Sequence, residues 1–263
     1  LPLLFSYNSN QAGGIEVANY TTASGSSAFA VGNDNLASGS YSTAMGRGTT
    51  ASGNDSTALG ANTEASGYGS TAMGYDTTAS GIVSTAIGTY TIASGDYSTA
   101  MGYYTIASGT YSTAMGYETE ASDYTSLVVG KHNLAGYTVT ASATEYSLDN
   151  TAFVIGNGSS WDNRSDALVV KFNGDATLAG NLNINSDARL KANIISLGST
   201  LSKLLQIDGK SYTMKKDESE KQKIGLLAQD IEKVFPELVS ESHGIKSVNY
   251  QGLVPVLINA LKE

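Results

Sequence analysis

The repeat unit ASGTYSTAMGYETE, at Ala107–Glu120, sets the architecture of the first half of the chain. Copies of this fourteen-residue unit follow one another at constant spacing. The alanine that opens each copy stands at Ala23, Ala37, Ala51, Ala65, Ala79, Ala93, Ala107 and Ala121. A short fixed period is typical of repeat proteins, in which every copy forms one layer of a stack.

A unit carries two glycines about seven residues apart. The second of them stands at Gly32, Gly46, Gly60, Gly74, Gly88, Gly102, Gly116 and Gly130. Because glycine tolerates a positive φ, we expect two tight corners in each turn. The Ser-Thr-Ala-Met-Gly run between them alternates like a strand. The sequence therefore predicts a parallel β-solenoid, and eight turns spaced by about 4.8 Å would be roughly 40 Å long.

Three side-chain rows follow from this stacking. We expect an apolar column at Met45, Leu59, Met73, Ile87, Met101, Met115 and Val129.

The copies of Ser42 and Thr43 are interpreted as a hydrogen-bonding, solvated β face, with a glycan-binding or ice-binding array as the alternative. An ice-binding face needs Thr-x-Thr, and these copies read Ser-Thr-Ala instead. A glycosidase is disfavoured, because Glu64 and Glu120 share a repeat position but lie four turns, roughly 19 Å, apart.

The 16 tyrosines are concentrated in the repeats. One repeat position holds Tyr41, Tyr97 and Tyr111, and another holds Tyr75, Tyr103 and Tyr117. Outward tyrosine stripes would bind sugars or a receptor, or would form cross-strand packing pairs. The sequence leaves both interpretations open.

The pattern STAMGxxTxASGxxSTA resembles the head repeat of YadA-like trimeric autotransporter adhesins over about residues 21–130. The resemblance implies a left-handed parallel β-roll, assembly as a homotrimer and display on a surface. A thin turn buries little apolar surface by itself, which also favours several chains packed side by side.

Composition excludes several classes of function. The net charge of -9 argues against a nucleic-acid partner. The chain has no cysteine, which excludes disulfides and thiolate chemistry, and no apolar run is long enough to insert into a membrane. We expect no cofactor and no metal, since no histidine or carboxylate cluster has ligand spacing. Residues 1–5 are too short for a signal peptide, and we expect both ends to be cut from a longer chain.

The repeat ends at Lys131, and residues 131–185 form a β-rich neck. Strands are predicted at Ala152–Ile155, Ala167–Phe172 and Thr177–Ile184, separated by turn residues. Trp161 is expected to pack at a corner without a functional role. His132 is expected to serve a turn or packing role.

From Ser186 onward the sequence resembles the C-terminal intramolecular chaperone domain of endosialidase-type tail spikes, a self-cleaving serine peptidase. The matching segments are Ser186–Ile194, Leu204–Lys215, Ile224–Val239 and Lys246–Glu263. The resemblance implies a small α+β domain at 186–263, after a β-roll head at 1–130 and the neck. The fold class is therefore a mostly β, trimeric fibre with a small α+β C-terminal domain.

The resemblance implies cleavage between Asn185 and Ser186. Ser186 would be the nucleophile, and Lys191, five residues later, its partner in a Ser–Lys dyad, since a serine hydroxyl needs a base. The lysine must be neutral, a state that burial at a trimer interface favours. Asp187 and Arg189 would fix the turn or pair across chains. By itself, Ser186 before Asp-Ala-Arg also suits a helix N-cap.

The sequence thus predicts a tail-fibre or surface-adhesin trimer with a single-turnover autoproteolytic domain that acts in cis. Its location would be extracellular, on a virion tail or a bacterial surface. Its partner would be a host cell-surface receptor, with glycan as one candidate. The alternative is a non-cleaving adhesin with a C-terminal trimerisation domain. His243, in a variable turn, is assigned no catalytic role.

Overall fold

The protein is described by a computed structural model, and its chain divides into two compact units, Leu1–Leu182 and Asn183–Glu263. The residues that the structure describes are 6–7, 15–17, 20–215 and 221–263. The N-terminal residues 1–5, considered above as a leader, lie outside this part. In the described ranges, no helix has the length and apolar character needed to cross a membrane.

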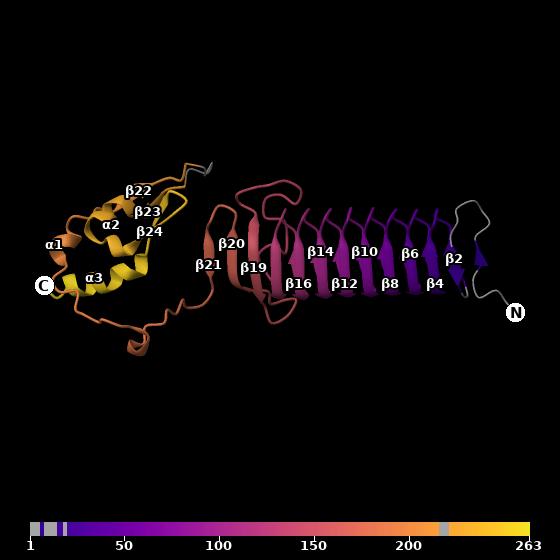
Figure 1. Ribbon diagram of the computed structural model, residues 1–263, viewed down its shortest axis with the longest axis horizontal. Coiled ribbons are helices and arrows are strands. Elements are labelled where there is room, and N and C mark those ends of the chain that lie inside the picture. The colour runs from indigo at the N-terminus through magenta and orange to yellow at the C-terminus, as the bar shows by residue number, and fades with distance from the viewer. Residues whose placement is uncertain (1–5, 8–14, 18–19, 216–220) are drawn as a thin grey trace. The chain divides into compact units, whose positions relative to one another are not determined.

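The first unit is a parallel β-solenoid in which each turn supplies one longer and one shorter strand (Figure 1). The five-residue strands are β4 (Phe29–Asn33), β6 (Thr43–Arg47), β8 (Thr57–Ala61), β10 (Thr71–Tyr75), β12 (Thr85–Thr89), β14 (Thr99–Tyr103), β16 (Thr113–Tyr117) and β18 (Leu127–Lys131). The two-residue strands are β3 (Thr22–Ala23), β5 (Leu36–Ala37), β7 (Thr50–Ala51), β9 (Glu64–Ala65), β11 (Thr78–Ala79), β13 (Ile92–Ala93), β15 (Ile106–Ala107) and β17 (Glu120–Ala121).

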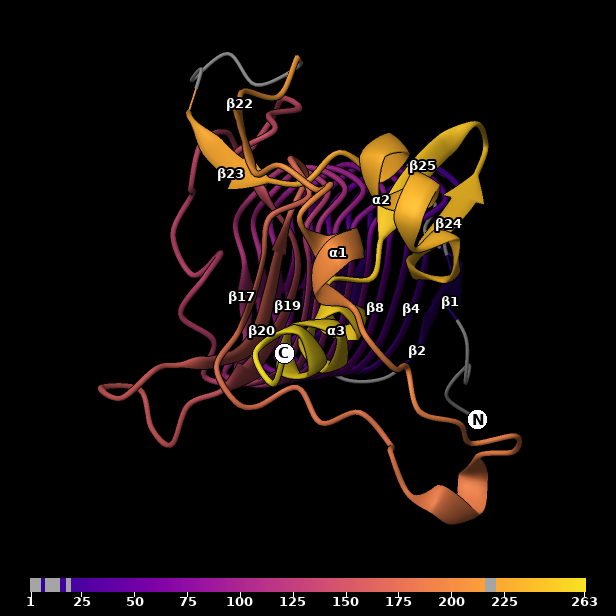
Figure 2. The ribbon, with the colours of Figure 1, turned by 90° about the vertical axis from the view of Figure 1, so that its left-hand side faces the viewer.

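Each strand residue pairs with the residue fourteen positions away, so side chains at the same repeat position stack. Met101, for example, lies between Ile87 and Met115 in the ladder of β12, β14 and β16. The longer strands form one sheet and the shorter strands a second sheet. Figure 2, viewed along the solenoid, shows successive strands one behind another. The predicted parallel β-solenoid is confirmed.

The core between the two sheets is made of small residues. The alanines of both strands are fully buried from Ala23 to Ala121, and Val128 and Val154 close the cluster. The interior is too thin for larger side chains, so the predicted apolar column faces outward instead: Met45 is 40% exposed. The stacking of that column is confirmed, but it belongs to the surface of the longer-strand sheet.

Serine and threonine rows also face inward. Ser42 and its copies are buried, and so is the row formed by Thr49 and its copies. The interpretation of the Ser42 row as a solvated surface is therefore wrong, because alternation along the strand points Ser42 and Ala44 to the same inner side. Thr43, on the other side, is half-buried.

A positive φ was expected at both glycines of each repeat, and the structure shows it at one of the two. Gly74 and its copies have φ values near +130°, as predicted, for example +131° at Gly74. The glycines of the Ala-Ser-Gly triplet are instead required by close approach: a Cβ on Gly67 would lie 2.0 Å from the carbonyl oxygen of Gly81. The left-handed corners are occupied by other residues, such as Tyr97 at φ 58° and Tyr104 at φ 50°.

Residues after β18 extend the longer-strand sheet. After the loop at 132–150, β19 (Thr151–Asn157) pairs parallel to β18. The sheet then continues antiparallel through β20 (Asp166–Lys171) and β21 (Ala176–Leu178). The first two predicted neck strands are confirmed. The third stops at Leu178 and not at Ile184: pairing with β20 ends after the hydrogen bond from the Ala179 N–H to the Ala167 carbonyl, and residues 179–187 are exposed. At the other end, β1 (Ser6–Tyr7) pairs with β2 (Ile15–Val17), which pairs with β4.

The second unit is a small mixed domain. Its helices are η1 (Ala188–Leu190), α1 (Leu201–Leu204), α2 (Ala228–Val234), η2 (Pro236–Leu238), η3 (Tyr250–Gly252) and α3 (Leu253–Ala260). Its hairpins are β22 (Lys210–Tyr212) with β23 (Lys223–Gly225), and β24 (Val239–Ser242) with β25 (Ile245–Val248). Ile231, Phe235 and Val256 form its buried core. The predicted α+β composition is confirmed.

Candidate functional site

The predicted dyad residues are in contact. Ser186 and Lys191 lie on either side of the short helix η1. The Nζ atom of Lys191 donates a hydrogen bond of 2.7 Å to the Oγ atom of Ser186. The sequence separation of five residues thus becomes a direct contact between the predicted nucleophile and its predicted base, and both side chains are exposed.

Asp187 and Arg189 stabilise the turn that creates this contact. The Asp187 carboxylate accepts a hydrogen bond from the Arg189 backbone N–H at 2.9 Å and caps η1. The Arg189 guanidinium donates to the same carboxylate at 2.6 and 3.1 Å. This side-chain hydrogen bond, followed by the backbone one, holds the pKa of Asp187 below its usual value. The cap is therefore Asp187, whereas the Ser186 hydroxyl is engaged by Lys191.

His243 lies away from this turn in the chain, at the corner between β24 and β25, with φ 51°. Its Nδ1 atom is 2.9 Å from the hydroxyl of Ser242. The contact gives it a local partner within its own hairpin.

Tyrosines stack along the surface of the solenoid. Tyr97 and Tyr111 have ring centroids 4.9 Å apart, and Tyr103 and Tyr117 are 5.0 Å apart, both pairs nearly parallel. These contacts support the packing interpretation for the two rows identified in the sequence. Their rings remain exposed, so packing and ligand binding are compatible.

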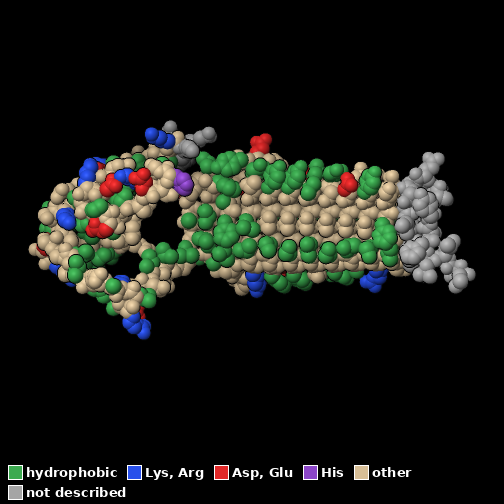
Figure 3. Space-filling view, in the orientation of Figure 1, with side chains coloured by type: hydrophobic (Ala, Val, Ile, Leu, Met, Phe, Trp, Pro, Cys, Tyr) green, Lys and Arg blue, Asp and Glu red, His purple; other side chains and the backbone are tan. Residues whose placement is uncertain are grey.

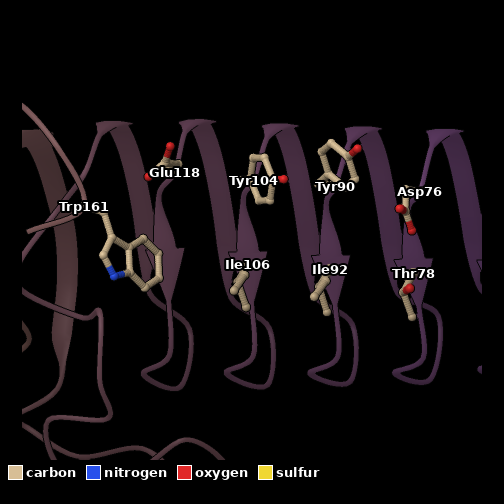
Figure 4. Close-up of a pocket in the computed structure, with 8 residues that line it drawn as sticks. All are labelled: Asp76, Thr78, Tyr90, Ile92, Tyr104, Ile106, Glu118 and Trp161. Atoms are coloured by element: carbon tan, nitrogen blue, oxygen red, sulfur yellow. The ribbon is translucent and has the colours of Figure 1, made fainter.

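A third tyrosine row was missed by the sequence analysis. Tyr90 and Tyr104 are fourteen residues apart at a corner position, and their rings stack at 4.5 Å. Together with Ile92, Ile106 and Trp161 they line a groove of about 450 Å³ (Figure 4). Asp76, Thr78 and Glu118 complete the lining. The signal in the sequence was the shared repeat position of the two tyrosines with Asp76 and Glu118.

Trp161 joins this groove from the neck and is 53% exposed. The expectation that it simply packs at a corner is therefore too limited. The Arg164 guanidinium lies 4.3 Å from its ring and 3.9 Å from the ring of Tyr137. Arg164 also donates hydrogen bonds to the backbone carbonyls of Glu118 and Asn133, each at 3.2 Å. These contacts fix the position of the indole.

His132 takes the left-handed corner of its turn, with φ 42°, and is buried. Its Nδ1 atom lies 3.1 Å from a carboxylate oxygen of Glu118. The turn role expected for His132 is confirmed, and its ring lies beside one carboxylate of the groove.

Two family models match the chain. One, described as "Chaperone of endosialidase", matches residues 186–240. The other, described as "YadA head domain repeat (2 copies)", matches overlapping stretches at residues 37–63, 65–91, 79–105, 93–119 and 107–132. The matched residues coincide with the solenoid turns and with the segment that opens at Ser186.

A similar protein is the long tail fiber protein Gp37 of Escherichia phage AR1. The two are 29% identical over 105 residues, which is 36% of this chain and 10% of that protein. The chain thus matches about a tenth of the length of this relative. Two parts of the chain are therefore similar to two families: residues between 37 and 132 to the YadA head domain repeat, and residues 186–240 to the chaperone of endosialidase.

Proposed function

We propose that the chain forms a trimeric fibre of a phage tail or bacterial surface, and that its C-terminal domain directs trimer assembly and then cuts itself off between Asn185 and Ser186. The observation that carries the cleavage step is the 2.7 Å contact between Lys191 Nζ and Ser186 Oγ. The family match at residues 186–240 and the similarity to a tail fibre protein support it.

The cleavage step is an N-to-O acyl shift followed by hydrolysis. The Ser186 Oγ attacks the carbonyl carbon of Asn185, and its proton passes to the neutral Lys191 amine. The amide C–N bond breaks, and Lys191 returns the proton to the departing Ser186 nitrogen. Water then hydrolyses the ester, which leaves the Asn185 carboxylate and a free Ser186 amine and hydroxyl.

Exposure of the dyad in the single chain fits a mechanism that is switched on by assembly. The mechanism requires the neutral form of the Lys191 amine, which can accept the serine proton. Burial of Lys191 in the trimer would favour its neutral form, because desolvation disfavours the charged state. Cleavage would therefore follow trimer formation and would not compete with it.

The longer-strand sheet offers the surface for the trimer. Its outer face carries the Met45–Val129 column and the Thr43 row over seven strands without a charged side chain at either position. Figure 3 shows hydrophobic side chains in rows along the solenoid. The outer positions of the shorter strands include Glu64 and Glu120 instead. Interface centres are depleted in charge, which favours the longer-strand face.

A chaperone domain would be useful to this fibre, because three repetitive chains can align in a wrong register. A chain displaced by one fourteen-residue repeat would find almost the same partners, so the register is weakly specified by the repeats alone. Parallel, non-local pairing is also slow to form. A separate domain that trimerises first would align the three chains.

The test is an intact-mass spectrum of the purified chain beside Ser186→Ala and Lys191→Ala. We expect two fragments in the wild type, with Ser186 as a new N-terminus, and one uncut chain in both variants. Ser202→Ala and Lys262→Ala serve as matched controls and should cut normally. A wild-type trimer that stays uncut would favour the second function, a non-cleaving adhesin with a C-terminal trimerisation domain.

In either case, the proposed role of the fibre is attachment to a host cell surface. The YadA head repeats and the tail fibre relative support this role and an extracellular location.

A further inference from the structure

The groove at Tyr90, Tyr104 and Trp161 has the composition of a binding site. Its floor is apolar, with Ile92 and Ile106 from neighbouring strands β13 and β15, and its wall is aromatic (Figure 4). Its volume of about 450 Å³ falls within the range of small-molecule sites. Carboxylates stand at its two ends, Asp76 and Glu118, three turns or roughly 14 Å apart.

The aromatic rings are held in place before any ligand arrives. Tyr90 and Tyr104 stack on each other at 4.5 Å, and Tyr75 meets Tyr90 edge-on at 5.5 Å. The guanidinium of Arg164 lies over the Trp161 ring, 4.3 Å from its centroid, and holds it in place. A ligand that lies on these rings would not need to order them, which lowers the entropic cost of binding.

The chemistry of the groove selects a class of ligand. The faces of aromatic rings carry a partial negative charge and attract the weakly positive C–H faces of sugar rings. Carboxylates accept hydrogen bonds from sugar hydroxyls, and they repel phosphate, sulfate and sialic acid. The backbone of the sheet below is already paired in its ladder, so an extended peptide would find no free edge there.

The groove also remains accessible in the proposed trimer. Ile92 and Ile106 belong to the shorter-strand sheet, whereas the uncharged apolar column belongs to the longer-strand sheet. A trimer formed through the longer strands would leave the shorter-strand side facing solvent.

We propose that this groove binds a neutral hexose oligosaccharide of the host surface, stacked on Tyr90, Tyr104 and Trp161 and held at its ends by Asp76 and Glu118. The proposal rests on the attachment role proposed above and specifies its ligand and its site.

Trp161 provides a direct reporter, because it is the only tryptophan of the chain. The full chain would be applied to an array of gluco-, galacto- and manno-oligosaccharides beside sialylated ones. The best neutral binder would then be titrated while Trp161 fluorescence is recorded. We expect a saturable change in emission, and at least about tenfold weaker binding for Tyr104→Ala. Tyr41→Ala, which removes an exposed tyrosine from another left-handed corner, should bind like the wild type.

Binding of the labelled protein to bacterial cells, measured in parallel, separates this proposal from the attachment role. Cell binding that persists unchanged in Tyr104→Ala and Trp161→Ala would overturn the groove proposal and leave attachment intact. Saccharide binding that is lost in Tyr104→Ala, without any cell binding by the wild type, would support the groove and overturn attachment. An array with no neutral binder, or with a sialylated one preferred, would also overturn the groove proposal.

Discussion

At the scale of single residues, Asp123 shows how the repeat is brought to an end. It stands where the other copies of the triplet have glycine, and it is fully buried. Its carboxylate accepts hydrogen bonds from the backbone N–H groups of Thr140 and Thr151, at 2.6 and 2.7 Å, and from the Thr151 hydroxyl. A buried carboxylate is tolerated when it is fully paired. Asp123 therefore attaches the loop at 132–150 to the last turn.

Glu120, a few residues away, gives a pH-dependent prediction. Burial raises the pKa of its carboxyl, although the Ser122 hydroxyl and Arg164 partly oppose the shift. In the window between the unfolded pKa of about 4.3 and the raised folded pKa, the folded state binds more protons, so stability falls as pH rises. We expect Glu120→Gln to raise the thermal unfolding midpoint at pH 7, because the variant avoids burying a charge.

Thermal unfolding followed by circular dichroism at pH 7 and pH 4 would measure this effect. The advantage of Glu120→Gln should shrink at pH 4, where the wild-type carboxyl is largely protonated. Glu64→Gln, the same change at the exposed carboxylate of the same repeat position, should have little effect. A Glu120→Gln midpoint below that of the wild type at pH 7 would contradict the interpretation.

At the scale of the element, the close stacking of the solenoid turns restricts which side chains can be buried between them and how these are hydrogen-bonded. The buried threonine row from Thr63 to Thr119 has no hydrogen-bond partner within the described structure. Stacking alone therefore does not pair these threonine hydroxyls, whereas in another row the Ser108 hydroxyl donates to its copy Ser122 at 3.1 Å. Asparagines occupy the same position near the two ends of the row. Asn35 bonds Gly46 and Thr49, and Asn133 bonds Glu120.

The corner glycines give the second prediction. A Cβ on Gly74 would lie 1.9 Å from the carbonyl oxygen of Gly88, and its φ of 131° strains any other residue. We expect Gly74→Ala to destabilise the solenoid by roughly 3 kcal/mol or more. Gly69→Ala is the matched control, since the atom nearest to its Cβ would be a Val83 methyl at 3.4 Å. Its left-handed backbone should cost about 1 kcal/mol.

Denaturant unfolding of the two variants would compare these costs. Equal midpoints for Gly74→Ala and Gly69→Ala would mean that the turns are able to move apart, against the close stacking described here.

At the scale of the whole molecule, the apolar face of the longer strands makes assembly testable. Met101 is 37% exposed on that face, and Ile92 is 39% exposed on the shorter-strand side. We expect Met101→Glu to prevent the three solenoids from packing on one another, because an unpaired charge at the centre of an interface is costly to desolvate. Ile92→Glu should leave the trimer intact.

Light scattering would give the mass of each variant, and intact-mass spectrometry its cleavage state. If packing of the solenoids is the step that buries Lys191 and switches the dyad on, Met101→Glu should stay uncut. A monomeric chain that still cuts at Asn185–Ser186 would show that the dyad needs no partner subunit.

The sequence by itself determined the repeat, its parallel stacking and the positions of Ser186 and Lys191, because these depend on a fixed period and on spacing along the chain. Tertiary structure decided which side of each strand faces inward. The core is so thin that small residues, mostly alanine, serine and threonine, fill it, so the methionine column is left on the surface and Ser42 is buried. It also decided the groove, since Tyr90, Tyr104 and Trp161 come together only when turns stack and the neck folds back on them. Such contacts join residues that are far apart in the chain, so a local sequence pattern does not predict them.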